Sequence, residues 1–264
     1  MGYLRLRQIC LVAKDLAPVE AQITATLGTE VCHRDPGVGK YGLHNALWAL
    51  GGTFLEVVAP KDPNSDTAAG RYITRRKGNG GYMYILDCDD LDARREHFKA
   101  MDARIVQDLH SGDEHIWSEA IHLHPRDTGG CLLSIDRHSG GENTMGGYHW
   151  AGPSWQEKAN PNIVITGATM QCDDPEAVAE RWSFLLRRPV LAGERGGVRQ
   201  MAFDNASANF GPLADNRGEG LSEVHMACRD VGAVVAAAKA AGARVGAEPS
   251  FELCGVRFIP HSMG

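Results

Sequence analysis

The chain of 264 residues is 43% hydrophobic and 23% charged, a composition typical of a globular protein of one or two domains. Its net charge of −6 and its pI of about 6.0 argue against nucleic acid and anionic membranes as partners. No apolar run approaches the roughly 18 residues of a membrane-spanning helix, and residues 1–7 are not followed by the apolar core of a signal peptide. We therefore expect a soluble, cytoplasmic protein.

Four segments in chain order share one pattern, an apolar strand-like run that ends in an aspartate. These aspartates are Asp15, Asp90, Asp174 and Asp230. Aspartate favours the N-cap of a helix, since its oxygen accepts a free backbone N–H, so a helix of about three turns is predicted after each one. The next strand is expected 16, 16, 16 and 15 residues later, at Val31, Val106, Val190 and Val245. This spacing indicates a four-fold repeat.

Two further apolar, alternating runs complete each copy. In the first copy they are residues 43–50 and 53–60, joined by the hairpin signal Gly51-Gly52. In the second and third copies they are predicted at residues 120–124, 131–136, 198–205 and 208–214. In the fourth copy, residues 251–259 leave room for two short strands or one long strand.

The repeat predicts an α+β fold of four tandem βαβββ modules, the last of them shortened. One such sheet has a bare face, so two modules must pair into a half-barrel whose concave face is a natural ligand site. We expect a first domain over 1–138, built from modules 1–60 and 80–138, and a second, reduced domain over 162–264. Residues 139–161, rich in Gly, Pro and Trp, are expected to form an ordered linker.

Seven cysteines occur, with no Cys-x-x-Cys pair among them. Cys10, Cys88, Cys172 and Cys228 lie in or beside strand-like runs, where a free cysteine packs as a small hydrophobic residue. Buried reduced thiols are therefore expected, in preference to disulfides or a zinc site.

This layout, with residues 42–48 (Gly-Leu-His-Asn-Ala-Leu-Trp) and 53–56 (Thr-Phe-Leu-Glu), resembles the glyoxalase, bleomycin-resistance and extradiol dioxygenase superfamily, also called vicinal oxygen chelate (VOC). The glyoxalase-like branch is the most similar. Residues 124–130 (His-Pro-Arg-Asp-Thr-Gly-Gly) also resemble a stretch of methylmalonyl-CoA epimerases. The resemblance covers nearly the whole chain in topology, but its motifs are short and specify the fold better than the reaction.

The resemblance implies four positions for a divalent metal, which fall here on Gln8, Glu56, Met83 and Ser134. Of these only Glu56 is a strong ligand for Mg²⁺, Mn²⁺ or Zn²⁺. In the second half the first-strand positions hold Gly167 and Glu223, with His225 two residues further on the same strand face. The family's metal chemistry is thus not supported at the usual positions.

An alternative metal set is Glu56 with His122 and His124, whose i, i+2 spacing places both rings on one face of a strand, with His44 nearby across the module interface. Its metal would be Mn, Fe, Zn or Ni. The competing interpretation, structural histidines and no cofactor, stands equally.

Glu56 interrupts an otherwise apolar strand. A carboxyl group buried on the concave side has a raised pKa, which suits a general base, whereas on the other face it would be solvated or paired. We name Glu56 as the catalytic candidate and Gln8, His44, Asn45 and Trp48 as the substrate-binding candidates.

Two functions stay open. The first is a lyase or isomerase acting on a small polar carbonyl compound. The second is a non-catalytic small-molecule binding or resistance protein without metal. In either case the second half is a candidate scaffold, the partner is a small molecule, and the chain is a monomer or a homodimer.

Overall fold

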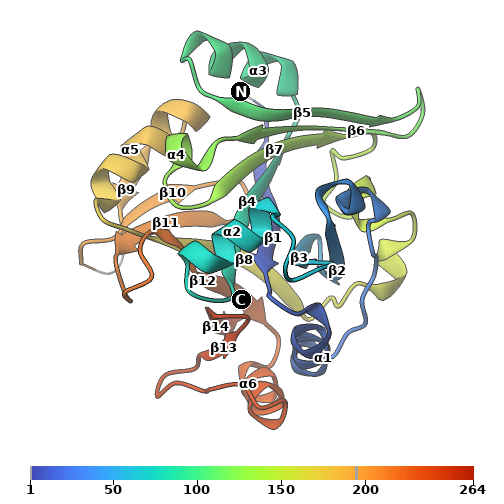
Figure 1. Ribbon diagram of the computed structural model, residues 1–264, viewed down its shortest axis with the longest axis vertical. Coiled ribbons are helices and arrows are strands. Elements are labelled where there is room, and N and C mark those ends of the chain that lie inside the picture. Colours follow the sequence, from blue (N-terminus) through green and yellow to red (C-terminus); the bar gives the residue numbers. More distant parts are fainter. Residues whose placement is uncertain (1, 194–195) are drawn as a thin grey trace.

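The computed structural model describes residues 2–193 and 196–264, in which four modules follow one another (Figure 1). The first two consist of β1 (Leu4–Val12), α1 (Leu16–Leu27), β2 (Leu43–Leu50) and β3 (Thr53–Pro60), then β4 (Gly80–Cys88), α3 (Leu91–Ala100), β5 (Ile105–Gly112), β6 (Trp117–Leu123) and β7 (Leu132–His138). The last two consist of β8 (Ile163–Cys172), α5 (Pro175–Leu186), β9 (Val190–Ala192), β10 (Arg199–Ala202) and β11 (Ser207–Pro212), then β12 (Gly220–Cys228), α6 (Val231–Ala240), β13 (Phe251–Leu253) and β14 (Val256–Ser262).

The strands form two curled seven-stranded sheets, which confirms the predicted α+β fold of paired half-barrels. The first sheet has the order β2-β3-β1-β4-β7-β6-β5 and the second β13-β14-β12-β8-β11-β10-β9. In each sheet the two modules join through their first strands, β1 with β4 and β8 with β12, both antiparallel. The antiparallel pairing brings two half-sheets edge to edge, and sheet twist curls the product.

Two of the four predicted second strands are absent from the described chain. The strands expected at Val106 and Val190 are β5 and β9, but those expected at Val31 and Val245 are reduced to single bridges, His33 with Leu47 and Val245 with Phe251. These segments would be edge strands, where a few polar or glycine residues suffice to end the pairing.

All four predicted aspartate caps are confirmed. A side-chain oxygen of Asp15, Asp90, Asp174 or Asp230 accepts the backbone N–H of an alanine two or three residues later, at 3.2, 2.9, 3.0 and 2.8 Å respectively. The four modules therefore share the same helix-capping hydrogen bond, as the sequence repeat predicts.

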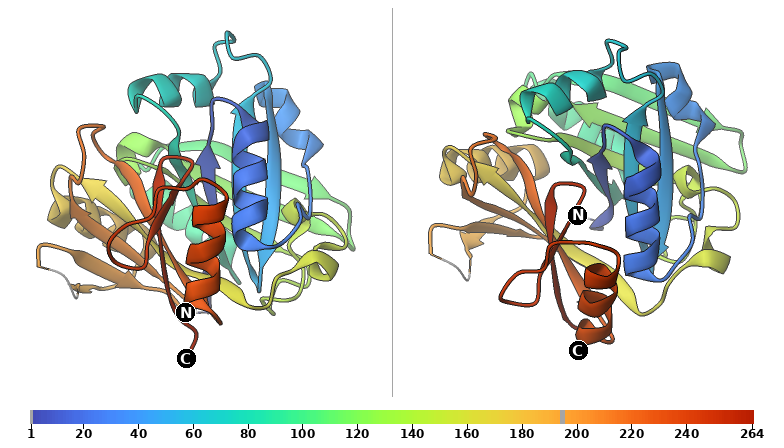
Figure 2. Two further views of the ribbon diagram at one scale, coloured as in Figure 1. Left: turned by 90° about the horizontal axis from the view of Figure 1, so that it is seen from below. Right: turned by 60° about the horizontal axis from the view of Figure 1, so that its bottom comes forward.

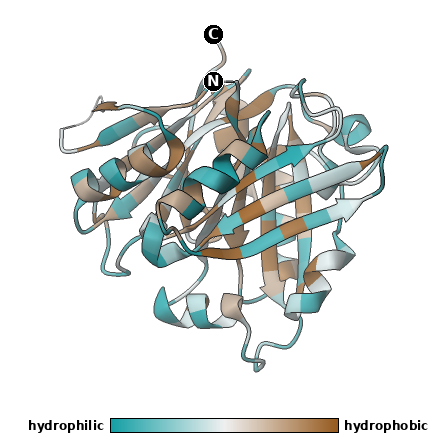
Figure 3. Cartoon of the chain, turned by 90° about the horizontal axis from the view of Figure 1, so that it is seen from above, coloured by the Kyte–Doolittle hydropathy of each residue, from teal (hydrophilic) through white to brown (hydrophobic). Residues whose placement is uncertain are grey.

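One core spans both halves. Its residues lie on the helix-covered faces of both sheets, and Figure 3 shows hydrophobic and hydrophilic segments alternating along the strands. Trp182 of α5 packs edge-on against Tyr84 of the first sheet and Phe210 of the second, and its indole N–H donates to the Thr128 carbonyl oxygen at 2.6 Å. Helices α1 and α6 lie side by side (Figure 2).

Shorter elements connect the modules. They are η1 (Pro36–Tyr41), α2 (Ala68–Arg75), α4 (Pro125–Thr128), η2 (His149–Ala151) and η3 (Trp155–Lys158). All seven cysteines are free thiols. None of the helices in the described ranges has both the length and the apolar composition needed to cross a membrane.

We predict that Asp230→Ala lowers the free energy of unfolding by about 1 kcal/mol, because it removes the α6 cap, whereas Asp230→Asn, which retains a capping oxygen, changes it by a few tenths. Urea-induced unfolding monitored by circular dichroism measures both values. Equal losses in the two variants would contradict a capping role.

Candidate functional site

The concave face of the first sheet carries the polar side chains. A register shift in the β1–β4 pairing, between Leu6 and Gln8, leaves Arg7 as an extra residue on β1. Such a bulge re-aims side chains. Leu6 and Ile9 belong to the main core. Arg7 and Gln8 are adjacent in sequence, yet the polar contacts of both lie on the opposite, concave side of the sheet.

Glu56, in the middle of β3, is 7% exposed and lies at the centre of a small hydrogen-bonded group. The side-chain amide of Gln8 donates to one carboxyl oxygen at 2.8 Å, and that of Asn45 donates to the other at 2.6 Å. Burial raises the pKa of Glu56, and hydrogen bonds from Asn45, Cys10 and Gln8 offset part of that rise. The structure thus places Glu56 on the concave side, one of the two alternatives left open by the sequence.

A strap formed by residues 139–161 covers part of this face. Tyr148 of the strap is 1% exposed and stacks on Phe54 with ring centroids 4.4 Å apart. Its hydroxyl donates to Gln8 Oε1 at 2.9 Å, which fixes the Gln8 amide with its N–H toward Glu56. Trp155 packs against the edge of Phe54. The aromatic residues of the strap therefore belong to the site.

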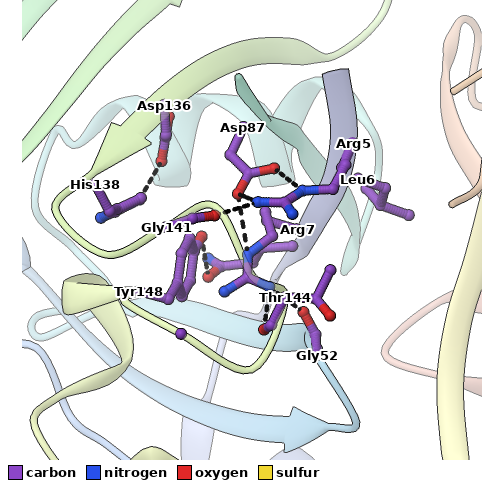
Figure 4. A network of polar contacts seen from close by, with 12 residues as sticks. Arg5, Leu6, Arg7, Gly52, Asp87, Asp136, His138, Gly141, Thr144 and Tyr148 are labelled. Atoms are coloured by element: carbon purple, nitrogen blue, oxygen red, sulfur yellow. Dashed lines mark hydrogen bonds and ion pairs between the residues drawn. The ribbon is translucent and has the colours of Figure 1, made fainter. Parts of the chain in front are cut away.

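Two buried arginines attach the strap to the sheet (Figure 4). Arg5 forms a two-pronged pair with Asp87, at 3.0 and 2.8 Å, and donates to the carbonyl oxygens of residues 141 and 142. Arg7 is fully buried, donates to the carbonyl oxygens of Gly52 and Thr144, and lies 3.4 Å from Asp87. Its guanidinium also lies over the Tyr148 ring, 4.8 Å from the centroid.

Two buried titratable side chains, those of Asp136 and His138, lie near Arg7. Asp136 accepts hydrogen bonds from the Ser134 hydroxyl and from the Trp150 indole N–H, yet burial raises its pKa to about 7. His138 Nε2 lies 4.0 Å from Asp136, and burial together with the charge of Arg7 holds the pKa of His138 well below its usual range. His138 is therefore neutral at physiological pH, while Asp136 titrates there.

The structure separates the predicted substrate-binding residues into two groups. Gln8 and Asn45 contact Glu56 directly. His44 is exposed, and Trp48 lies under α1 with its indole N–H donating to the Thr24 hydroxyl at 3.0 Å. Because successive side chains of a strand alternate between faces, His44 and Trp48 project away from Asn45. The sequence motif of residues 42–48 thus mixes site and core residues.

The predicted metal set is not assembled. His122 lies on the concave face, in register with Ser134, and burial lowers its pKa to about 4. His124 follows the last residue of β6, and its Nδ1 accepts the backbone N–H of Arg126 as the cap of α4. No group of three or more His, Cys, Asp or Glu suited to a metal occurs in residues 2–193 and 196–264. The family positions offer one carboxylate, one amide, one thioether and one hydroxyl, a poor donor set for a hard divalent ion.

Sequence reasoning missed the strap's tyrosine and the arginine pairs. Arg5, Arg7 and Asp87 lie within apolar strand-like runs. Charged residues in such runs are rarely buried unless they are paired, so their presence there was the available signal of buried ion pairs. It also missed helix α2. Arg76, directly after α2, is 1% exposed and donates to the carbonyl oxygens of residues 217–219, so it joins the two halves.

We predict that Asp136 makes the protein less stable as the pH rises from about 4 to about 7. The folded state, with the raised pKa, holds the proton in this window while the unfolded state has released it, so the contribution is complete at low pH and is lost towards neutrality. A pKa difference of about three units between the folded and unfolded states corresponds to a decrease in the free energy of unfolding on the order of 4 kcal/mol.

Asp136→Asn removes this dependence, and Asp66→Asn, at a side chain 82% exposed, serves as the control. Unfolding free energies of the three proteins at several pH values provide the test. Parallel curves for the wild type and Asp136→Asn would contradict the assignment.

Three comparisons place the chain among known proteins. Residues 9–186 match the family model described as a glyoxalase-like domain. The ethylmalonyl-CoA/methylmalonyl-CoA epimerase of Cereibacter sphaeroides is 26% identical over 136 residues, which are 50% of this chain and 97% of that protein. The mitochondrial methylmalonyl-CoA epimerase of Mus musculus is 24% identical over 133 residues, 50% of this chain and 72% of that protein.

Solved structures resemble the chain over nearly its full length. A hypothetical protein from Staphylococcus aureus superposes with a TM-score of 0.66 and 11% identity, covering 98% of this chain and 99% of that one. The Mn(II)-bound glyoxalase from Novosphingobium aromaticivorans gives 0.66 and 12%, covering 99% of this chain and 83% of that one. At these identities the likeness concerns the fold. Because the family model matches more than half of the sequence, the chain belongs to the glyoxalase-like domain family.

Proposed function

We propose that this protein is a VOC-type enzyme of the lyase or isomerase kind that moves a proton beside the carbonyl group of a small polar compound, with Glu56 as the proton-transfer group. Membership in the glyoxalase-like family supports a VOC-type enzyme. The observation that carries the proposal is the buried carboxyl group of Glu56, held by two amides on the concave face and with a raised pKa.

The arrangement suits proton transfer for a physical reason. General acid–base catalysis works best when the pKa of the group lies near the working pH, and burial moves Glu56 in that direction. Gln8 and Asn45 each hold a different carboxyl oxygen, so the carboxyl plane is fixed before a substrate binds. Tyr148 fixes Gln8 in turn.

The route that we propose for a ligand leads to Glu56 from the side away from the strap. There the apolar cluster of the concave face is only partly buried, at Val38 of η1, Ile73 of α2, and Tyr82 and Met83 of β4. Movement of η1 or α2 would open this side without breaking the arginine contacts of the strap. His124 has no role in this mechanism, because its ring caps α4.

The second candidate is a non-catalytic binding protein. It is favoured by the same apolar cluster, which also includes Val12, Val58, Tyr72 and Cys10, the register partner of Glu56. Such a lining suits an apolar or aromatic compound whose single polar group is received by Glu56 and its amides.

Solvent exchange distinguishes the two functions. In D₂O, proton NMR would follow loss of the hydrogen beside the carbonyl in a panel of 2-hydroxy aldehydes, 2-hydroxy ketones and malonyl-type thioesters. We predict that the wild type exchanges this hydrogen in at least one class. Glu56→Gln is expected to lose about 10²–10⁴ of the rate, the usual contribution of a positioned acid or base.

Glu119→Gln is the matched control, because Glu119 lies on β6 beside His110, outside the Glu56 group. Exchange that is equal in the wild type and Glu56→Gln would refute Glu56 as the proton-transfer group. Binding of a panel member without any exchange would instead favour the binding protein.

A further inference from the structure

The short helix η1 connects the two edges of the first sheet. It precedes β2, which is one edge strand, and β5 is the edge strand at the opposite end of the sheet. The hydroxyl of Tyr41, the last residue of η1, donates to Gln107 Oε1 on β5. The sheet therefore curls far enough for one short segment to bridge the mouth of its concave face. This contact marks a wall of the concave face that lies across from Glu56 on β3.

Three side chains with hydrogen-bond donors meet at this wall, and we call them the donor group: Lys40, Gln107 and His122. Gln107 and His122 are register partners on β5 and β6. Lys40 Nζ lies 4.9 Å from the centroid of the Tyr41 ring, whose hydroxyl binds Gln107. Burial lowers the pKa of His122, and the charge of Lys40 lowers it further. An ammonium, an amide and an imidazole group thus lie near one another.

The donor group has unused hydrogen-bonding capacity. Because Gln107 Oε1 accepts from Tyr41, the amide nitrogen of Gln107 remains as a donor. Within residues 2–193 and 196–264, this nitrogen and the ring nitrogens of His122 have no hydrogen-bond partner, and Lys40 has no ion pair. Lys40 is exposed, and Gln107 and His122 are partly exposed. A ligand in the concave face can therefore reach all three.

The donor group is positively charged at physiological pH. The pKa of His122 is lowered to about 4, so its imidazole is neutral there and offers one N–H donor. The amide of Gln107 is neutral as well, and Lys40 supplies the single charge of the group. A ligand at this wall thus meets one cation and two neutral donors.

The nearest acidic side chains on the surrounding elements are directed elsewhere. Asp108 is the register partner of Ile121, a residue of the main core, so Asp108 and Glu119 lie on the other face of the sheet. Asp136 of β7 is buried and accepts two hydrogen bonds of its own. Asp35 caps the first turn of η1, at the end of η1 away from Lys40. None of these four carboxyl groups forms an ion pair with Lys40.

We propose that the donor group binds an anionic group of the substrate, a carboxylate or a phosphate, which makes the substrate a negatively charged carbonyl compound. This inference rests on the function proposed for Glu56 and names the class of substrate. Lys40 would form a charge-assisted hydrogen bond with the anionic group, and Gln107 and His122 would form neutral ones. With the anionic group at the wall across from Glu56, its repulsion of the Glu56 carboxylate is smallest.

Two matched pairs of compounds test the inference by binding alone. They are dihydroxyacetone with dihydroxyacetone phosphate, and methyl levulinate with levulinate. NMR titrations of the full chain, followed at the His122 ring and the Gln107 side-chain amide, give the dissociation constants. We expect the anionic member of at least one pair to bind about tenfold more tightly than its neutral partner, the effect of roughly one charge-assisted hydrogen bond. The pair that shows this preference distinguishes phosphate from carboxylate.

Two variants locate the preference. Lys40→Gln should bind the two members of the pair about equally, because it removes the cation. Gln107→Glu should also lose the preference, because it replaces a donor with a negative charge. Lys239→Gln, the same change of charge at an exposed side chain of α6, is the matched control and should keep the preference. Circular dichroism verifies that each variant is folded; if Gln107→Glu is not, Lys40→Gln decides.

The inference is overturned if the anionic and neutral members bind equally to the wild type, if no compound binds, or if folded Lys40→Gln keeps the preference. Glu56→Gln should keep the preference, so binding at the donor group is measured separately from proton transfer. Glu56-dependent exchange on neutral compounds in D₂O, without any preference for anions, would leave the proposed function intact and refute only the donor group.

Discussion

The antiparallel pairing of the first strands of two modules is the constraint from which the site follows. It sets β1 beside β4 and β8 beside β12, and the rest of each module extends outwards from that seam. Each seam contains register shifts, so that adjacent residues on one strand can serve the same face. In the first sheet this brings Arg7 and Gln8 to the concave side together, and Gln8 is the residue that connects Glu56 with the strap.

The burial of charged side chains is the second constraint on the structure of the first sheet and its strap. A fully buried guanidinium is costly unless its charge is compensated, and Arg7 is compensated by Asp87 and by two backbone carbonyl oxygens, one of which belongs to the strap. The strap therefore covers the sheet and also supplies a hydrogen-bond acceptor that the buried arginine requires. Its Tyr148 and Trp150 reach Gln8 and Asp136 respectively, so the same segment orients the group around Glu56 and desolvates Asp136.

Much of the fold was predictable because it repeats. Four capping aspartates at constant spacing specify four helices and their flanking strands without any long-range information, and the Gly51-Gly52 hairpin places β2 and β3 to the residue. The edge strands at Val31 and Val245 were not predictable, since edge pairing depends on neighbours that periodicity does not report. The site was predictable only in part. Gln8, Asn45 and Glu56 share a face by alternation, but Tyr148 is 140 residues from Gln8, and His124 leaves the strand one residue too early to join His122.

The proposed chemistry requires that Glu56 is buried on the concave face with a raised pKa. A titration of protein labelled with ¹³C at the glutamate carboxyl carbon, followed by NMR for the wild type and Glu56→Gln, tests it most directly. We expect one resonance that titrates well above the ordinary value of about 4.3 and that is missing from the variant. If every glutamate titrates near that value, or if the displaced resonance persists in Glu56→Gln, then Glu56 does not have the raised pKa that its burial implies.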